Sequence, residues 1–194
     1  MDMVSFDEAF SQLQHRSTKY VISDSDIENV KRKKLEEYDD EECDEIWRLH
    51  KELLTDAMKN NDSNEVGYLI NLVDWECIVV YGTDNGISLR SNPDAQELVV
   101  EAPKNSLLFF HNHPKNTTLS EQDLNTFLSS DSIKTVSAIT NNGRQYFLTK
   151  TEGYDKDVAL NEYDRIFTEK GEGSVKEFLR VCRKWELIFE YGGL

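Results

Sequence analysis

The chain has 194 residues, 38% of them hydrophobic and 30% charged, a composition that fits one folded domain with a sizeable hydrophobic core. Its 37 acidic and 22 basic residues give a net charge of −15, which opposes general binding to nucleic-acid phosphates. No apolar run is long enough to cross a membrane, and the acidic start lacks the basic and apolar regions of a signal peptide, so we expect a cytoplasmic protein.

The beginning of the chain predicts a helical N-terminal extension over residues 1–45. Residues 5–8 (SFDE) fit a helix-capping box, and apolar residues follow them at helical spacing. Residues 31–45 change from basic to acidic, which is typical of a solvated helix or a loose connection. Between residues 46 and 58, apolar side chains recur on one stripe, which predicts an amphipathic helix with a half-buried His50 beside the stripe.

Downstream of this helix the pattern predicts strands. Runs rich in Val, Ile, Tyr and Trp continue up to a turn signal at residues 84–86 (DNG), and residues 92–105 indicate an irregular or briefly helical connection. Residues 106–111 (SLLFFH) are a continuous apolar run, which is typical of a central, buried strand. A short helix and two strands joined by an Asn-Asn-Gly turn are predicted at residues 120–130, 134–140 and 144–150.

The last part of the chain, residues 156–194, predicts a helical segment packed on the domain. Apolar residues as far as Phe189 fall on one helical face, and Gly171 and Gly173 interrupt the helix once. The elements together predict an α+β fold, in which helices at both ends flank a mixed sheet of about five or six strands. The central domain of this fold is expected at residues 46–155.

Two of the chain's four histidines, His111 and His113, stand two residues apart at the end of the predicted central strand. Alternate residues of a strand point the same way, so both imidazoles should project from one face while Asn112 turns to the other. Pro114 should end the strand, because proline cannot donate to the ladder. Two imidazoles held in this way can supply two ligands of a zinc site.

A third ligand is available from the next predicted helix. Ser120 is placed to be its N-cap, and Asp123 lies in its first turn. The short loop of residues 114–119 can fold this helix start back over the strand end, so that Asp123 faces the two histidines. A capping box with Ser120 would by itself explain Asp123, and the two roles are compatible. Three protein ligands plus a water are the open arrangement of a catalytic zinc.

This set of residues resembles the JAMM (MPN+, JAB-domain) metalloprotease family. The family pattern is an upstream glutamate, then His-Ser/Thr-His-Pro, then Ser-x-x-Asp. The residues that match it are His111, His113, Pro114, Ser120 and Asp123. Asn112, in place of Ser or Thr, is similar to the bacterial RadC-like branch and to phage- or toxin-associated JAB domains. Nine residues separate His113 from Asp123, one fewer than in the most familiar members.

The resemblance covers about residues 50–150 and implies an MPN/JAB-like, cytidine-deaminase-like catalytic domain at residues 46–155. It implies one zinc ion bound by the two histidines and Asp123. It also implies hydrolysis of peptide or isopeptide bonds, including those of ubiquitin-like conjugates. The expected partner is therefore a protein or peptide substrate, with no nucleic acid and no membrane. The oligomeric state is not indicated.

The family's catalytic base is a glutamate on the first strand, often close to a glycine. Glu65, two residues before Gly67, stands in that position, and Glu76 and Glu101 are weaker alternatives. A carboxylate there would take the proton of the attacking water and deliver it to the leaving amine. The resemblance gives Ser120 a second catalytic role, as a hydrogen-bond donor to the oxyanion formed on the scissile carbonyl.

Two other classes of function stay open at this point. One is a non-catalytic MPN-type interaction module, although inactive members usually lack metal ligands and all three are present here. The other is a RadC-like, DNA-associated protein, which the shared His-Asn-His-Pro sequence suggests and the net charge of −15 opposes.

Overall fold

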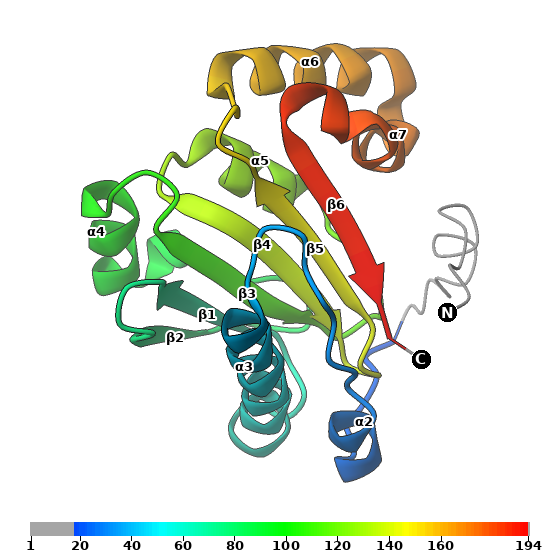
Figure 1. Ribbon diagram of the computed structural model, residues 1–194. Coiled ribbons are helices and arrows are strands. Elements are labelled where there is room, and N and C mark those ends of the chain that lie inside the picture. Colours follow the sequence, from blue (N-terminus) through cyan, green and yellow to red (C-terminus); the bar gives the residue numbers. More distant parts are fainter. Residues whose placement is uncertain (1–17, 194) are drawn as a thin grey trace.

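The structure, a computed structural model, describes residues 18–193 (Figure 1). The capping box predicted at residues 5–8 lies outside the described residues. The helices are α2 (Asp24–Glu28), α3 (Asp40–Asn60), α4 (Pro93–Glu101), α5 (Glu121–Ser129), α6 (Lys156–Lys170) and α7 (Ser174–Val181), with short 3₁₀ turns η1 (Leu89–Ser91), η2 (Gly171–Gly173) and η3 (Cys182–Trp185). The strands are β1 (Val66–Asn71), β2 (Cys77–Tyr81), β3 (Leu107–His113), β4 (Ile133–Thr140), β5 (Gln145–Lys150) and β6 (Leu187–Gly192).

The six strands form one mixed sheet in the order β2-β1-β3-β4-β5-β6. Only β3 and β4 pair in parallel; the other neighbours are antiparallel. The α+β fold with a mixed sheet flanked by helices is therefore confirmed. The predicted central strand is also confirmed, since β3 has a strand on each side and all seven of its residues are buried.

Helices cover both faces of the sheet (Figure 1). α3 packs on one face and α4 to α7 pack on the other, each over its own hydrophobic cluster. The alternation along β3 divides its side chains between them. Leu108 and Phe110 belong to the cluster under α3, whereas Leu107 and Phe109 belong to the cluster under α4 to α7. His111 and His113 share the parity of Phe109, so the fold directs them to the α4–α7 side.

The sequence of α3 explains why it forms a long helix with one buried face. Asp39 caps its first turn and exchanges hydrogen bonds with Glu42, as a capping box requires. Its buried positions recur at intervals of three and four residues and place His50 on the sheet side. The expectation of a half-buried His50 is wrong, because its ring is fully buried between Phe110 and Phe147, at ring-centroid distances of 4.7 and 5.2 Å.

The C-terminal segment departs from the prediction. Residues 156–185 are largely helical as expected, but β6 was predicted as helix and instead pairs with β5 as the sixth strand. Glu186, at a left-handed φ of 57°, ends the helical part. From there Leu187, Phe189 and Tyr191 face one cluster at a spacing of two, not at the helical spacing. The predicted division of the chain at residues 45 and 155 stays a prediction.

Within residues 18–193, no helix combines the length and the apolar character that crossing a membrane would require.

Candidate metal centre

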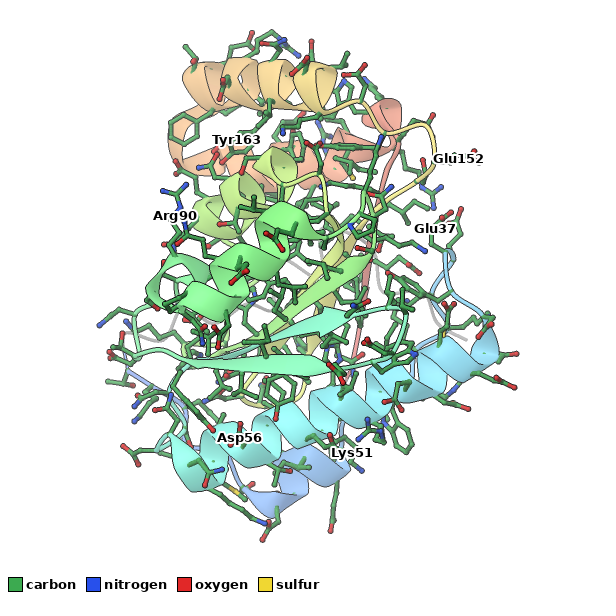
Figure 2. All side chains as sticks on the ribbon, turned by 90° about the vertical axis from the view of Figure 1, so that its left-hand side faces the viewer. Glu37, Lys51, Asp56, Arg90, Glu152 and Tyr163 are labelled. Carbon is green, nitrogen blue, oxygen red and sulfur yellow. The ribbon has the colours of Figure 1, made fainter. Side chains whose placement is uncertain are left out.

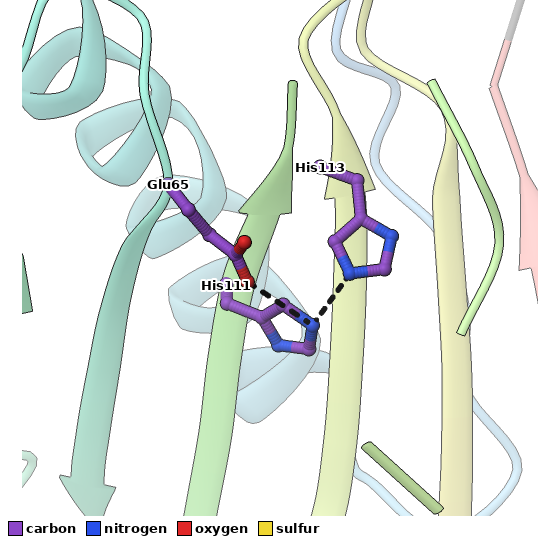
Figure 3. Close-up of side chains that lie close together, drawn as sticks. All are labelled: Glu65, His111 and His113. Carbon is purple, nitrogen blue, oxygen red and sulfur yellow. Dashed lines mark hydrogen bonds and ion pairs between the residues drawn. The ribbon is translucent and has the colours of Figure 1, made fainter. Parts of the chain in front are cut away.

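His111 and His113 bring their rings together at the end of β3. Their Nε2 atoms lie 2.9 Å apart, and the two side chains are 0% and 8% exposed. Figure 3 shows both rings and the carboxylate of Glu65 converging on one point. The strand alternation predicted from the sequence therefore puts both imidazoles on one side, where a single ion could contact both Nε2 atoms.

Asp123 reaches this point from the first turn of α5. Its Oδ1 lies 3.1 Å from Nε2 of His111, and its Oδ2 lies 3.4 Å from Nε2 of His113. The chain can fold back so sharply because Pro114 ends the strand and Asn116 adopts a left-handed φ of 56°, which asparagine tolerates. The structure thus brings together the three residues that the sequence predicted as metal ligands.

Ser120 fixes the orientation of the Asp123 carboxylate. The backbone N–H of Ser120 donates to Oδ2 at 2.6 Å and its hydroxyl donates to the same atom at 2.7 Å, while the N–H of Asp123 donates back to the hydroxyl oxygen at 3.2 Å. This is a complete capping box. Both roles considered for Asp123 are therefore geometrically compatible, because the cap uses Oδ2 and leaves Oδ1 directed at His111.

Glu65 lies just before β1, with its Oε1 4.0 Å from Nε2 of His111. The side chain is 7% exposed, and burial raises the pKa of its carboxyl, an effect that His111 and His113 partly offset. β1, which begins at the next residue, pairs with β3, and in this pairing Gly67 lies opposite His111. The two weaker candidates are not at the site. Glu76 lies in the β1–β2 connection, at the other end of β1, and Glu101 is an exposed residue at the end of α4.

The site favours an ionised Asp123. Burial alone would raise the pKa of this carboxyl, but the two histidines outweigh it and hold the pKa well below its ordinary range. Burial would likewise lower the pKa of His113, yet contact with Asp123 raises it to about 9. Negative charge is therefore stabilised where the two imidazole nitrogens meet, as a cation-binding site requires.

The two imidazoles are held by different neighbours. Nδ1 of His113 lies 3.0 Å from the carbonyl oxygen of Thr117, to which it donates a proton. Nε2 is therefore the ring nitrogen that faces Asp123, and it would bind a metal ion on losing its own proton. Such a contact to the outer ring nitrogen is typical of metal-binding histidines. His111 instead stacks on Phe109, at a ring-centroid distance of 5.1 Å, and its buried Nδ1 has no hydrogen-bond partner among residues 18–193.

Asn112 holds the backbone on both sides of Glu65. Its Oδ1 accepts the N–H of Val66 at 2.7 Å, and its Nδ2 donates to the carbonyl of Asn64 at 3.1 Å and to Oδ1 of Asn141 at 2.6 Å. The sequence predicted that Asn112 would turn away from the metal. It gave no sign of this contact, because Val66 and Asn112 are 46 positions apart in the sequence. The residue between the two histidines thus anchors the segment that carries Glu65.

The spacing of the ligand atoms is compatible with one bound metal ion. Ligands at zinc bond lengths in a tetrahedron are about 3.3 Å apart, whereas here the two Nε2 atoms are 2.9 Å apart and Oδ1 of Asp123 lies 3.1 Å from Nε2 of His111. Glu65, His111 and His113 also form a buried group with ligand atoms within 4.8 Å of one another. Since Glu65 is 4.0 Å from the nearest imidazole nitrogen, Asp123 fits the third ligand position better and Glu65 lies just outside it.

Comparison of the chain with protein-family models, with curated proteins and with solved structures found no match in any of the three. The resemblance to the JAMM family therefore depends on the motif residues alone, and membership of that family stays a prediction.

Proposed function

We propose that the protein is a zinc-dependent hydrolase of peptide or isopeptide bonds with an MPN/JAB-like fold. The observation that carries this proposal is the convergence of His111, His113 and Asp123, with the buried carboxylate of Glu65 beside them. Beside this cluster lies a cavity of about 160 Å³, lined by Glu65, His113, Ser120 and Asp123. A cavity of that size can admit water and the bond to be cleaved.

The proposed reaction assigns a role to each side chain. A zinc ion held by His111, His113 and Asp123 would polarise the attacking water and the scissile carbonyl. Glu65 takes a proton from that water as it attacks the carbonyl carbon, and then delivers the proton to the leaving amine as the carbon–nitrogen bond breaks. Burial raises the pKa of the Glu65 carboxyl above its ordinary value, the direction that suits a group that must both accept and donate a proton.

Ser120 has a second role in this proposal. Its hydroxyl donates to Asp123 and also lines the cavity. A donor in this position could turn toward the oxyanion that forms on the scissile carbonyl and stabilise it. The N–H of Ser120 would then still hold Oδ2 of Asp123, so the ligand would keep its orientation.

Metal analysis of the purified protein tests the centre. We expect about one zinc ion per chain, lost in His113→Ala because one of three protein ligands is removed. His50→Gln is a matched control, since it replaces another buried histidine that hydrogen-bonds Ser137 rather than the cluster. Wild-type zinc content in His113→Ala would overturn the ligand assignment. Equal loss of zinc in both variants would point to general unfolding.

Neither alternative class of function has a supporting observation of its own. An interaction module has no use for a buried carboxylate aimed at two imidazoles, and the net charge of −15 opposes a DNA-associated role. Protein or peptide substrates, including ubiquitin-like conjugates, stay part of the proposal.

A further inference from the structure

A larger groove continues from the metal cavity along α5. It has a volume of about 1030 Å³ and shares Ile87, Gln122 and Asp123 with the smaller cavity. Its lining follows α5 from Asp123 to Ser130. Seven residues of helix rise about 10 Å, which is the length of about three residues of extended peptide. A chain cleaved at the metal centre would therefore have room for a short flanking segment here.

The lining of the groove includes apolar residues, of which Leu89 is buried in the core and Val100 is exposed. Val99 and Val100 of α4, Leu89 of η1 and Leu160 of α6 line it. Val100 is 77% exposed, although valine usually lies in the interior of a protein. Where the groove meets the metal cavity, the side-chain amide of Gln122 donates to the carbonyl of Ile87 at 3.1 Å. The groove thus combines apolar residues of η1, α4 and α6 with polar residues along α5.

Arg90 gives the groove a positive charge. It is the only basic residue among the described residues that line the groove, and no residue of the range 18–193 makes a hydrogen bond or ion pair with its guanidinium. By contrast, the chain supplies a carboxylate partner to each of Arg32, Arg48, Arg165, Arg180 and Arg183. In Figure 2, Arg90 lies on the α4 and α5 side of the sheet, whereas Lys51 and Asp56 lie on α3.

The guanidinium of Arg90 is exposed and has no carboxylate partner among the described residues. The acidic residues of the groove, Glu121 and Asp123, both lie in the first turn of α5, and Asp123 is engaged with the histidines and Ser120. A carboxylate is a ligand group whose geometry matches the paired N–H donors of a guanidinium. The charge that complements Arg90 can therefore come from a bound molecule.

We propose that this groove binds about three residues of an extended peptide next to the scissile bond, with apolar side chains and one acidic side chain that pairs with Arg90. The position next to a scissile bond rests on the proposed function. The peptide-binding surface itself does not depend on zinc, so peptide binding and the proposed hydrolase function can be tested separately.

Binding of short peptides to the 194-residue chain tests whether the groove holds such a peptide. The probes are fluorescein-labelled, C-terminally amidated pentapeptides, Gly-Leu-Glu-Val-Gly and its Gln and Lys versions at the central position. Fluorescence anisotropy with zinc-loaded Glu65→Gln protein measures affinity without cleavage. We expect the Glu peptide to bind roughly two- to fivefold more tightly than the Gln peptide, the range of one exposed ion pair, and the Lys peptide to bind most weakly.

Arg90→Glu, combined with Glu65→Gln, should reverse this order, so that the Lys peptide binds more tightly than the Glu peptide. Arg48→Glu, in the same background, is the matched control, because it makes the same charge change on α3, at the other face of the sheet. An unchanged preference in the Arg90→Glu protein would overturn the proposal. So would an equal effect of Arg48→Glu, which would show that only net charge matters, or the absence of binding by every peptide.

The same titration in His113→Ala separates this surface from the hydrolase. If wild-type protein holds no zinc and cleaves nothing, but the Arg90-dependent preference persists in both proteins, the groove is supported and the proposed function fails. If wild-type protein binds zinc and cleaves peptides with no Arg90-dependent preference, the groove proposal fails and the proposed function stands.

Discussion

Glu65 is the residue on which the proposed chemistry depends. Glu65→Gln keeps the size of the side chain but cannot accept a proton, and the residue lies outside the three-ligand set. We expect the variant to keep its zinc and to lose turnover of a cleaved peptide by about two orders of magnitude or more. Zinc content and turnover are measured on one preparation. Bound zinc with undiminished turnover would place the base elsewhere, and loss of zinc would make Glu65 a ligand.

Asn112 should influence the turnover rate although it does not contact the metal ion. Asn112→Ala leaves the N–H of Val66 and the carbonyl of Asn64 without their buried partner, so Glu65 loses its anchor on both sides. We expect unchanged zinc content, an unfolding free energy lower by roughly 3 kcal/mol, and a kcat lower by about tenfold with little change in KM.

Ser137→Ala is the control for Asn112→Ala. It removes another buried polar side chain, which hydrogen-bonds His50 and does not contact the segment of Glu65. Its loss of stability should leave kcat unchanged in assays well below the unfolding temperature. If both variants lower kcat equally, Asn112 is only a structural residue.

At the residue scale, the sequence predicted the site residues whose arrangement depends on neighbours a few positions away in the chain. His111 and His113 follow from strand alternation, and Ser120 with Asp123 follows from the spacing of a capping box. Glu65 was identified only through the family resemblance, since nothing local connects it to residues 46 positions downstream. The Asn112 contact has no local pattern either, because it forms only when β1 and β3 pair.

At the element scale, α5 couples a helix start to the metal centre. Asp123→Asn should weaken zinc binding, because a neutral amide replaces a charged ligand, and should also loosen the first turn of α5 by weakening the cap and removing a favourable charge. Ser120→Ala separates the two effects. It removes the hydroxyl of the cap at a cost of about 1 kcal/mol, but leaves the Asp123 carboxylate available to the metal.

To separate the two effects, zinc affinity and the thermal unfolding of the apo protein are measured for both variants. Asp123→Asn should lower both, and Ser120→Ala should lower chiefly stability. Undiminished zinc affinity in Asp123→Asn would leave Asp123 with its capping role alone.

Several elements were predicted correctly because their local sequence signals are clear. β3, β4, β5 and α5 appear where the apolar runs and turn residues placed them. β6 was missed because a short run of aromatic and aliphatic residues fits both a helical face and an alternating strand. Pairing with β5 favours the strand over the helix, and that pairing joins residues about 40 positions apart in the sequence.

At the scale of the whole molecule, the order of the strands brings the site together. β1 and β3 are antiparallel neighbours, so the start of β1 meets the end of β3 and Glu65 reaches the histidines. β4 runs parallel to β3, and the turn after it supplies Asn141 to Asn112. The sequence predicted the class of fold but not this order, because strand order is set by packing between distant segments.

His50 should make the stability of the whole fold depend on pH. Its ring is fully buried, and burial, with a smaller effect of His111, lowers its pKa from 6.5 to about 3. The unfolded chain therefore binds a proton below pH 6.5 that the folded protein excludes. The stabilising contribution is fully present above pH 6.5 and falls as the pH drops toward 3, by about 2 kcal/mol at pH 5.

Comparison with His50→Gln isolates this contribution, because glutamine does not titrate and can still hydrogen-bond Ser137. Urea unfolding of both proteins at pH 7 and pH 5 gives the two free-energy differences. Acid release of zinc and protonation of the carboxylates affect both proteins alike and cancel in the difference. We expect the wild type to be the more stable at pH 7, and the gap to shrink by about 2 kcal/mol at pH 5. A constant gap would mean that His50 takes up its proton equally well in the folded and unfolded states, and that the packing of α3 on the sheet does not exclude it.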